Sequence, residues 1–464
     1  MRLWHELKER MLRHPDQTVR EGGGVMTYEE LVIFAEQLAA RLTDAYYGIL
    51  CHSELGAAMA MLACFAAGKP AVPLPVRYGE AYYKKILNRA EPPALLTDFG
   101  DGLYPVRLTD APICAHRMPP ETEVVLFTSG STGVPKGVML SGENLLTNVR
   151  DICGYFPISR EDTILIARPL YHSSVLTGEF LAALWCGAGI VFSSKPFQPQ
   201  NILTQMREER VTVFGGTPTL LSALARFVKG KKDLTIRLLT VSGECMTDGM
   251  AKAIRSGFPA AEVYCGYGLS EASPRVAYLP PKLFDVCPTV TGLPLAKVQV
   301  RIIRNGKAVW QDYDTGELWV KGKNVMLGYF NDLERTAAIL RDGWLRTGDL
   351  AFWNPDGLLT VRGRSDDMIL RAGMNIYPAE VENALSGDPR VRDVLVYGFS
   401  RNGTQEIGLK ICGSFAEVDA VMRLCRERLP AFQLPARVEL VPDTEMLCGG
   451  KKNRRKKADE ENGT

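Results

Sequence analysis

A loop rich in glycine and hydroxyl side chains follows a short apolar run, in the sequence VVLFTSGSTGVPKG at 124–137. Glycines let backbone N–H groups approach a phosphate closely, and the hydroxyl groups add further donors. Lys136 supplies a mobile positive charge for the outer phosphates of a nucleotide. The loop lacks the Gly-Lys-Ser/Thr ending of a Walker A loop, so it predicts a phosphate-binding loop of a different kind.

Further motifs follow this loop in chain order. They are YGLSE at 267–271, GELWVKG at 316–322 with Gly328-Tyr329, TGDL at 347–350, and GRSDDMILRAGMNIYPAEVE at 363–382. Together with the loop they resemble the motifs of the AMP-forming adenylating superfamily, which includes acyl- and aryl-CoA synthetases, adenylation domains and firefly luciferase. The style of the last motif is closest to the acyl- and aryl-CoA ligases.

The resemblance implies a reaction in two steps. A carboxylate attacks the α-phosphate of ATP to give an acyl-adenylate and pyrophosphate, and a thiol then attacks the adenylate to give a thioester and AMP. Because the first step joins an anion to a polyanion, cations and N–H donors must gather at the α-phosphate. The implied cofactors are ATP and Mg²⁺, with CoA or a phosphopantetheinylated carrier protein as the thiol.

The resemblance also assigns roles on the nucleotide side. Glu271 is expected to coordinate Mg²⁺, which prefers oxygen ligands. Tyr267 is expected to stack on adenine, and Asp349 to hold the ribose hydroxyls with help from Arg364. The full set of expected ATP and AMP contacts is Thr128, Ser129, Gly130, Ser131, Thr132, Gly133, Lys136, Gly243, Glu244, Tyr267, Gly268, Ser270, Asp349 and Arg364.

On the acyl side, His172 in PLYHSS at 169–174 matches a family element that gates or lines the acyl pocket. No acidic residue follows it before Glu179, which argues against an α-amino acid as the substrate. Cys265 stands where the family often has an asparagine that pairs with adenine, so backbone groups near Gly243 are the expected substitute. The expected acyl pocket is His172, Gly216, Thr217, Gly243, Cys265 and Gly266.

Three features are expected in the last hundred residues. By resemblance, Asp366 is the hinge about which a small domain turns between the two half-reactions, as a residue tolerant of φ/ψ change would allow. The thiol acceptor would then face Gly373, Met374 and Asn375. Lys451, or Lys452 one residue later, is expected to bridge the carboxylate and the α-phosphate, which makes Lys451, His172 and Glu271 the predicted catalytic residues.

The elements that must position these residues alternate between strand and helix. A capping box at 27–30 predicts a helix that continues to about residue 42. Apolar or β-branched runs, each followed by a turn and then a longer helical pattern, predict βαβ units around a largely parallel sheet. These runs lie at 124–127, 163–167, 190–193, 211–214 and 238–241.

The pattern changes after about residue 290. Alternating runs at 298–304, 317–321 and 358–362, with hairpin signals at Asn305-Gly306 and Asp356-Gly357, predict a small antiparallel β subdomain. The predicted class is therefore α/β, with a large N-terminal domain at 1–365 that combines parallel-type αβ subdomains and this β subdomain. A small mobile α+β C-terminal domain would follow at 366–464, with a charged, solvated tail from about 455.

Composition excludes several classes of function. Of 464 residues 46% are hydrophobic, and 55 basic against 53 acidic side chains leave a formal charge of +2. That balance argues against a nucleic-acid binder and a membrane-binding surface, and the charged start does not resemble a signal peptide. Eleven cysteines without a CxxC pair predict reduced thiols and a cytoplasmic location.

Three hypotheses of function stay open. The first is an ATP-dependent ligase that makes an acyl- or aryl-CoA from a benzoate-like, cinnamate-like or medium-chain acid. The second is an adenylation enzyme that loads a separate carrier protein, suggested by the run LPAFQLP at 429–435. The third is a nucleotide-binding protein without catalysis, motivated by the departures from the family at Cys265 and upstream of Lys451.

Overall fold

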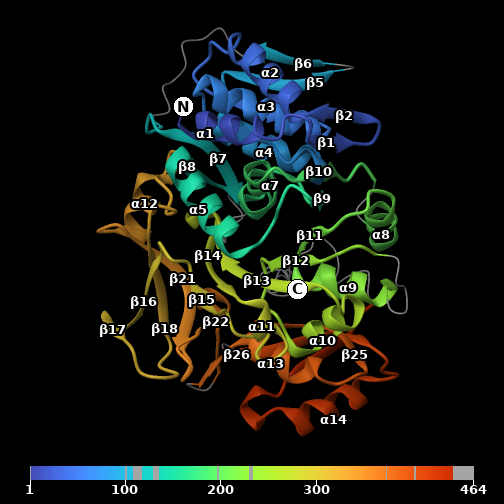
Figure 1. Ribbon diagram of the computed structural model, residues 1–464. Helices are drawn as coiled ribbons and strands as arrows, with labels where there is room; N and C mark the ends of the chain where they lie inside the picture. The colour runs from blue at the N-terminus through green and yellow to red at the C-terminus, as the bar shows by residue number, and fades with distance from the viewer. Residues whose placement is uncertain are drawn as a thin grey trace.

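The computed structural model describes residues 2–99, 102–107, 118–128, 135–195, 198–228, 234–371, 374–401 and 404–442. Within these ranges, three large sheets and their helices form the chain up to residue 364, and two small sheets lie in the remainder. Figure 1 shows the N-terminal elements at one end of the molecule and the C-terminal elements at the other. The predicted α/β class, with a large N-terminal part and a small C-terminal part, is confirmed.

A nine-stranded sheet carries the predicted βαβ units. Its order is β15-β14-β13-β12-β11-β9-β10-β1-β2, parallel from β13 to β1 and antiparallel at both edges. Parallel strands end at one common edge, where open α/β sheets bind their ligands. The strands are β1 (Thr18–Glu21), β2 (Gly24–Thr27), β9 (Thr163–Ile166), β10 (Gly189–Phe192), β11 (Val213–Gly216), β12 (Leu238–Ser242), β13 (Glu262–Gly268), β14 (Arg275–Leu279) and β15 (Leu293–Pro294).

A second, seven-stranded sheet holds both ends of the phosphate loop. Its strands run in the order β19-β8-β7-β4-β3-β5-β6. Here the sequence prediction needs a correction, because the run at 124–127 leads into an antiparallel partner strand before the next helix begins. The strands are β3 (Tyr47–Leu50), β4 (Ala71–Pro73), β5 (Ala94–Phe99), β6 (Gly102–Arg107), β7 (Thr122–Thr128), β8 (Lys136–Ser141) and β19 (Gly328–Tyr329).

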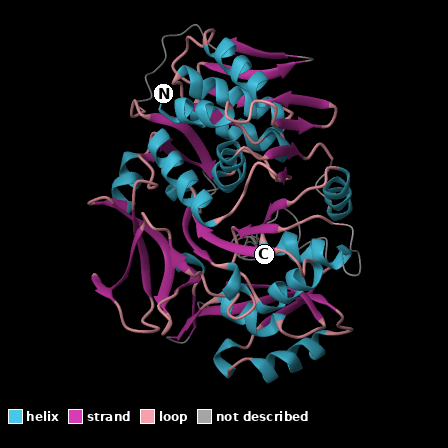
Figure 2. Cartoon of the chain, viewed as in Figure 1, coloured by secondary structure: helices cyan, strands magenta, loops and turns pink. Residues whose placement is uncertain are grey.

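The third sheet is the predicted antiparallel β subdomain. It has the order β17-β16-β18-β21-β20, with β22 added beside β21. Figure 2 shows its long strands beside the mixed helical and strand part of the chain. Its strands are β16 (Gln299–Arg304), β17 (Lys307–Val309), β18 (Gly316–Lys321), β20 (Leu340–Arg341), β21 (Trp344–Trp353) and β22 (Leu359–Arg364).

Helices cover the sheets and bury their apolar faces. Thr27 and Glu30 form the predicted capping box of α2, which ends at Ala39, three residues short of the predicted extent. The helices are α1 (Arg2–Met11), α2 (Tyr28–Ala39), α3 (Glu54–Ala67), α4 (Glu80–Ala90), α5 (Gly142–Tyr155), α6 (Ser173–Val175), α7 (Ala182–Cys186), α8 (Pro199–Glu208), α9 (Pro218–Val228), α10 (Asp248–Gly257), α11 (Pro281–Phe284) and α12 (Leu333–Ile339).

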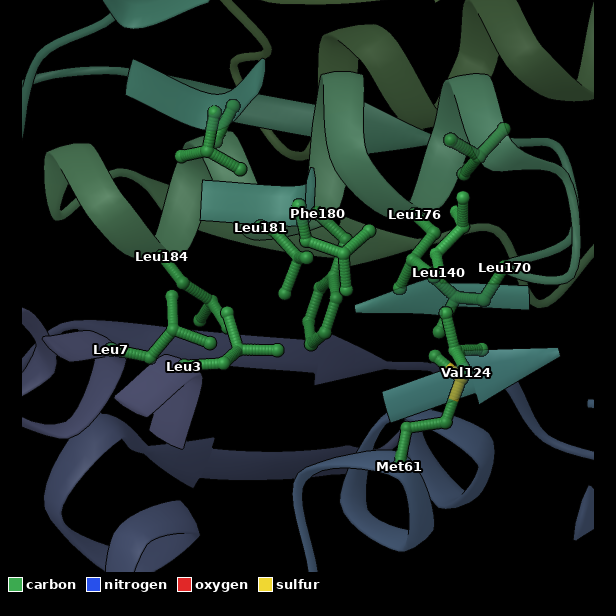
Figure 3. Close-up of a cluster of buried hydrophobic side chains, with 14 of the residues drawn as sticks. Leu3, Leu7, Met61, Val124, Leu140, Leu170, Leu176, Phe180, Leu181 and Leu184 are labelled. Atoms are coloured by element: carbon green, nitrogen blue, oxygen red, sulfur yellow. The ribbon is translucent and has the colours of Figure 1, made fainter. Parts of the chain in front are cut away.

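A π-helical segment, Leu176–Leu181, joins α6 to α7 and has two different faces. Leu176, Phe180 and Leu181 are fully buried in the main hydrophobic cluster, together with Leu184 of α7. Figure 3 shows these side chains directed toward leucines of α1 and Met61 of α3. Phe180 also packs on Phe192 of β10, and Glu179 lies against Gly215 of β11, so the segment contacts the nine-stranded sheet through both apolar and charged side chains.

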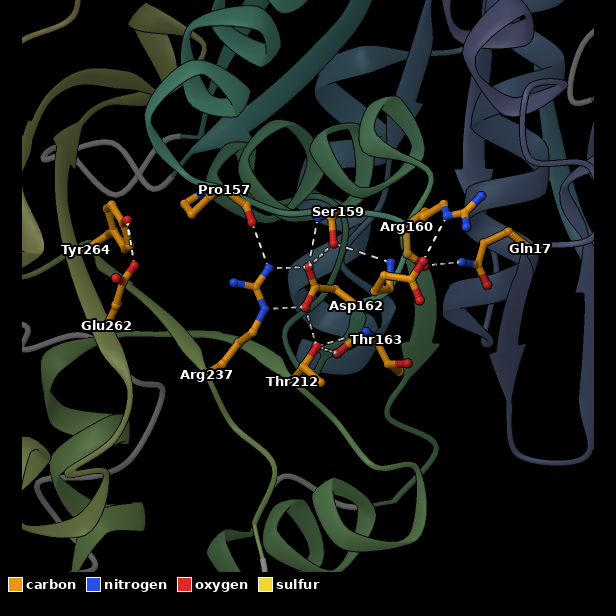
Figure 4. Close-up of polar contacts among 11 residues, drawn as sticks. Gln17, Pro157, Ser159, Arg160, Asp162, Thr163, Thr212, Arg237, Glu262 and Tyr264 are labelled. Atoms are coloured by element: carbon orange, nitrogen blue, oxygen red, sulfur yellow. Dashed lines mark hydrogen bonds and ion pairs between the residues drawn. The ribbon is translucent and has the colours of Figure 1, made fainter.

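A polar network joins the amino ends of three parallel strands of the nine-stranded sheet (Figure 4). Arg237 Nε lies 2.7 Å from Asp162 Oδ1, and Thr212 Oγ1 donates to the same oxygen at 2.8 Å. Burial raises the pKa of Asp162, but hydrogen bonds from Arg237, Ser159 and Thr212 outweigh it and lower that pKa below its usual range. The network fixes β9, β11 and β12 relative to one another.

The chain beyond residue 368 buries its own hydrophobic cluster. Ile369, Val396, Leu409 and Leu424 belong to it, and none of its members precedes Ile369. This part contains both helices and strands, as the predicted α+β character requires. The elements are β23 (Ile369–Arg371), β24 (Met374–Ile376), α13 (Pro378–Ser386), β25 (Val391–Arg401), β26 (Thr404–Gly413), α14 (Val418–Arg428) and β27 (Arg437–Leu440).

In the described ranges, no helix is both long enough and apolar enough to span a bilayer.

Candidate active site

The two ends of the phosphate loop are fixed side by side. Thr128 is the last residue of β7 and Lys136 the first of β8, and the two are direct partners in the antiparallel ladder. Gly137 needs to be glycine because a Cβ there would come within 2.9 Å of the Phe330 Cβ. The predicted contacts Ser129, Gly130, Ser131, Thr132 and Gly133 lie outside the described residues.

Lys136 is a partly buried cation among other charged groups. Its Nζ lies 5.4 Å from the centre of the Tyr329 ring. Burial, the largest effect, lowers the pKa of Lys136, and the charge of Glu271 acts in the opposite direction. The charges of Arg364 and Asp366 also act on this lysine, so residues 228 or more positions later in the chain lie near it.

Glu271 lies in a short 3-10 turn, Ser270–Ala272, directly after β13. Tyr329 donates its hydroxyl to Glu271 Oε1 at 2.7 Å, and the backbone oxygen of Glu271 accepts from Met326 at 2.9 Å. Burial and the neighbouring carboxylate both raise the pKa of Tyr329, which therefore stays a donor. Tyr329 belongs to the GELWVKG and Gly328-Tyr329 motif, but the motif does not indicate a role for its side chain. Its hydrogen bond to Glu271 is seen only in the structure.

The side chains near Glu271 suit a Mg²⁺ ion that takes some of its ligands from the phosphates of the nucleotide. In the described part of the chain, no three His, Cys, Asp or Glu side chains gather to form a complete metal site. Mg²⁺ is commonly bound by one or two carboxylates together with substrate phosphates. Glu271 beside Lys136 fits that pattern.

The residues expected to contact the ribose form one connected group. Asp349 and Arg364 are partners on β21 and β22, and Arg364 Nη1 lies 3.3 Å from Asp349 Oδ1. The same Nη1 donates to the Thr347 carbonyl at 2.8 Å. Tyr267 donates its hydroxyl to the other Asp349 oxygen, and burial followed by that carboxylate raises the pKa of Tyr267. Gly348 has φ +71°, a turn conformation that glycine favours.

A hydroxyl contact joins the acyl side to the nucleotide side. Ser173 Oγ lies 2.9 Å from Ser270 Oγ, although 97 positions separate them. His172 precedes α6, and its ring stacks on Tyr171 with centroids 4.2 Å apart. The PLYHSS and YGLSE motifs therefore meet, as the expected pocket requires.

The other expected pocket residues lie at the carboxyl ends of adjacent strands. Gly216 ends β11, while Cys265 and Gly266 on β13 are partners of Val241 and Ser242 on β12. Gly243 follows β12 with φ +98°, a left-handed conformation. Burial raises the pKa of Cys265 to about 12, so this thiol stays protonated and is not a nucleophile.

Thr217 and Glu244 complete the turns at these strand ends. Glu244 Oε2 accepts from the backbone N of Thr219 at 3.2 Å and from Thr219 Oγ1 at 2.6 Å. This contact ties the turn after β12 to the start of α9 and so fixes the backbone expected to face adenine. Gly268, the last residue of β13, has no room for a side chain, because a Cβ there would lie 1.6 Å from the Pro274 oxygen.

Two buried charged residues and one half-buried arginine near these strand ends are not among the site residues predicted from the sequence. Glu179 on the π-helical segment is fully buried and pairs with Arg168, while Arg275 at the start of β14 is 2% exposed. A charged residue within an otherwise apolar run could have indicated them, and the clearest example is Arg275 in RVAYL at 275–279. Sequence reasoning noted Glu179 only as an acid too distant from His172.

The C-terminal part contacts the large part through α10 and α13. The backbone N of Asp248 donates to Asn383 Oδ1 at 2.9 Å, and Arg362 pairs with Glu380 at 3.1 Å. Asp366 lies in the turn Ser365–Asp367 between the two parts. Met374 and Asn375 are exposed on β24, whereas Gly373, Lys451, Lys452 and the tail from 455 lie outside the described residues.

Comparisons with known proteins agree with the motifs. The family model described as AMP-binding enzyme matches residues 7–124 and 114–330. A feruloyl-CoA synthase of Amycolatopsis sp is 31% identical over 477 residues, covering 97% of this chain and 96% of the relative. A 2-succinylbenzoate–CoA ligase of Bacillus subtilis is 29% identical over 450 residues, covering 92% and 90%.

Solved structures give the same picture. The o-succinylbenzoate CoA synthetase MenE of Bacillus subtilis, in complex with its acyl-adenylate intermediate, superposes with a TM-score of 0.81 at 25% identity over 97% of both chains. The same enzyme has been solved with ATP and magnesium, with a TM-score of 0.79. With its motifs, its fold and its relatives in agreement, the chain belongs to the AMP-binding enzyme family.

Proposed function

We propose that this chain is an ATP-dependent ligase that joins a carboxylic acid to CoA through an acyl-adenylate. The observation that carries the proposal is the meeting of three groups at one edge of the nine-stranded sheet. These groups are the Lys136–Glu271–Tyr329 cluster, the Tyr267–Asp349–Arg364 group and the Ser173–Ser270 contact next to His172.

In the first half-reaction, a carboxylate oxygen of the acid forms a bond to the α-phosphorus of ATP, and pyrophosphate leaves. Lys136 and the loop that it closes would offset the charge of the β- and γ-phosphates. Glu271 would hold Mg²⁺ against the phosphates, and that ion neutralises part of their charge. Asp349 would accept hydrogen bonds from the ribose hydroxyls, since Tyr267 and Arg364 hold its carboxylate in place and each oxygen can accept more than one bond.

In the second half-reaction, the CoA sulfur bonds to the acyl carbon, the thiol proton is lost and AMP leaves. The choice of CoA is supported by the relatives named above, which are CoA ligases, whereas loading of a carrier protein has no comparable support. We place the acceptor on the side of Met374 and Asn375, together with Gly373. The exposure of Met374 and Asn375 leaves them accessible to a thiol substrate.

The division of the chain completes the proposal. We assign residues 1–365 to the nucleotide- and acid-binding domain and 366–464 to a domain that turns about Asp366. The separate hydrophobic cluster beyond Ile369 supports this boundary. Lys451 would bring a cation to the carboxylate and the α-phosphate in the first half-reaction. A cytoplasmic location is proposed on the free thiols of the nine cysteines described by the structure.

The test is pyrophosphate release from ATP and Mg²⁺ over a panel of aryl, arylalkanoic, fatty and amino acids, with CoA present and absent. We expect one class of acid to release pyrophosphate and to give a CoA thioester. Lys451→Ala should remove the signal, whereas Lys307→Ala, on an exposed hairpin, should preserve it. Thioester on a carrier protein but none on CoA would refute CoA as the acceptor, and failure of every acid would refute the ligase.

A further inference from the structure

Arg275 is a buried cation without a neutralising partner in the described part of the chain. It is 2% exposed, yet its guanidinium forms no ion pair within 4.0 Å there. Its Nη2 reaches Thr240 Oγ1 only at 3.4 Å, and its Nε has no hydrogen-bond partner. A buried guanidinium is normally paired and fully hydrogen-bonded, so a group that satisfies Arg275 is missing.

The neighbouring carboxylate, Glu179, is already paired through one of its oxygens, while its Oε2 has no hydrogen-bond partner. Glu179 pairs with Arg168 at 2.5 Å between their closest side-chain atoms. Both side chains lie near the carboxyl ends of β9 and β11, since a Cβ on Gly215 would come within 2.5 Å of the Glu179 carboxylate. The three residues Arg168, Glu179 and Arg275 thus carry one positive charge in excess.

Two glycines leave space for the guanidinium within the predicted acyl pocket. A Cβ on Gly266, a predicted pocket residue, would approach Arg275 Nε to 2.8 Å. A Cβ on Gly178, across from it, would approach Nη2 to 3.3 Å. Gly178 follows His172 by six residues along one helical stretch, so at about 1.5 Å per residue Gly178 lies about 9 Å along that helix from His172.

Other charged and titratable groups around Arg275 do not supply the missing partner. Tyr155 lies against it, and burial raises the pKa of Tyr155 while Arg275 acts in the opposite direction. The pKa of this phenol stays raised, so it is neutral: its oxygen accepts from the guanidinium but supplies no negative charge. The backbone N and O of Arg275 are both bound to Asn148, which fixes the start of β14 but leaves the side chain without an anion.

We propose that the acid substrate carries two carboxylates, one at each end. One is activated by ATP, and Arg275 binds the other at the far end of the acyl pocket. The inference rests on the proposed ligase function and names its class of substrate. A carboxylate would satisfy Nε and a terminal nitrogen together, as in the paired hydrogen bonds that guanidinium groups form with carboxylates. Arg275 would then determine specificity without taking part in the chemistry.

The test compares matched acids that differ only at the far end. The probes are 3-(4-carboxyphenyl)propanoate against its neutral 4-carbamoyl analogue, and suberate against octanoate, each assayed by pyrophosphate release and thioester formation. For one pair or both, we expect kcat/KM to favour the dicarboxylate by at least ~100-fold, since a site with a buried unpaired group rejects analogues that leave it unpaired. Arg275→Gln should abolish that preference, and Arg275→Lys should retain part of it.

Arg237→Gln is the matched control, because Arg237 is an arginine of the same sheet at the opposite, amino end of the strands (Figure 4). It should leave the preference unchanged. If Arg275→Gln lowers turnover of both acids of a pair equally, the role of Arg275 is structural and the inference is wrong. A wild-type enzyme without preference for either dicarboxylate would also overturn it.

Calorimetry of acid binding to the AMP-loaded protein separates this inference from the ligase proposal. Binding of a dicarboxylate that Arg275→Gln abolishes, with no pyrophosphate released, would refute the ligase and support the anion site. Thioester formation unaffected by Arg275→Gln would support the ligase and refute the anion site. Thermal unfolding and AMP binding of Arg275→Gln show that the variant is folded in either case.

Discussion

Glu271 is the residue on which the charge balance of the first half-reaction depends most directly. Its carboxylate lies beside the Lys136 cation, and one of its oxygens accepts from Tyr329 at 2.7 Å. Glutamine can keep the hydrogen bond from Tyr329, but it removes the negative charge that a divalent cation needs.

We therefore expect Glu271→Gln to lower kcat for pyrophosphate release by roughly 10²–10³, the range seen when one electrostatic group is removed from an active site. Part of the loss should be recovered at high Mg²⁺ concentration. Glu334→Gln, an exposed glutamate in the first turn of α12, is the control and should stay at the wild-type rate. A wild-type rate for Glu271→Gln as well would remove Glu271 from the metal site.

Lys136 should set the pH above which kcat/KM for ATP declines. Burial lowers its pKa from the usual value of about 10.4, so the side chain loses its proton, and its charge, at a lower pH than a solvated lysine. We predict that kcat/KM for ATP falls as pH rises through this lowered pKa. In Lys136→Arg the guanidinium stays charged, so the fall should move to higher pH. The same alkaline limit in both proteins would assign it to another group.

Sequence motifs indicate candidate site residues where residue type and order are informative, but they do not indicate residues that are recognised only by their contacts in the fold. Thr128, Lys136, Ser270, Glu271 and Asp349 lie in motifs, and the structure brings the parts of the chain that hold them together. Arg275 stands in an ordinary strand sequence, and only its burial without an anion distinguishes it. Tyr329 lay within a motif, but its hydroxyl contact with Glu271 requires two sheets to meet.

Among the secondary-structure elements, the π-helical segment Leu176–Leu181 is fully buried, so it leaves little room for larger side chains around it. One of its faces is buried with leucines of α1, and the other places Glu179 against β11. Glu179 is fully buried and held by Arg168, so its carboxylate cannot move aside for a larger residue on β11.

Gly215→Ala is therefore expected to destabilise the protein by about 1–3 kcal/mol, the usual cost of an overpacked core position. Its new Cβ would lie 2.5 Å from the Glu179 carboxylate. The measurement is denaturant unfolding, with Gly23→Ala as the control, since a Cβ at Gly23 meets nothing within 4 Å. Equal stability of the two variants would show that Glu179 moves freely.

Element types were easier to predict than element boundaries and partners. The alternation of apolar runs and helical patterns identified β9, β10 and β12 closely, but β11 lies at 213–216 rather than 211–214. Val211 and Thr212 have the apolar and β-branched character of a strand, yet Thr212 uses its hydroxyl on Asp162 at the end of the ladder. The pairing of β7 with β8 was missed because the loop between them hides a hairpin.

The molecule as a whole is divided between a large and a small part that meet at α10 and α13. Gly249 lies so close to α13 that a Cβ would come within 2.3 Å of the Ser386 oxygen. The backbone contact from Asp248 to Asn383 depends on this close approach. The arrangement described here is thus one particular docking of the two parts.

If the two half-reactions use different dockings, Gly249→Ala should slow one of them selectively. Alanine favours a helix over glycine by up to ~1 kcal/mol, so the large part should not lose stability. We expect pyrophosphate release and thioester formation from preformed adenylate to change by different factors, about tenfold apart. Lys252→Ala, on the exposed face of α10, is the control. Equal changes in both half-reactions would contradict selective docking.

The three large sheets contribute different things to the site. Lys136 and Tyr329 come from the seven-stranded sheet, Asp349 and Arg364 from the antiparallel sheet, and Arg168, Gly215, Gly266 and Arg275 from the nine-stranded sheet or the turns at its strand ends. The proposed ATP contacts are thus shared among all three sheets, whereas the residues proposed to select the acid come from one of them. If Arg275 selects the acid as proposed, replacing it would shift the preference toward neutral acids, while Lys136, Asp349 and Arg364, which belong to the other two sheets, would keep their positions.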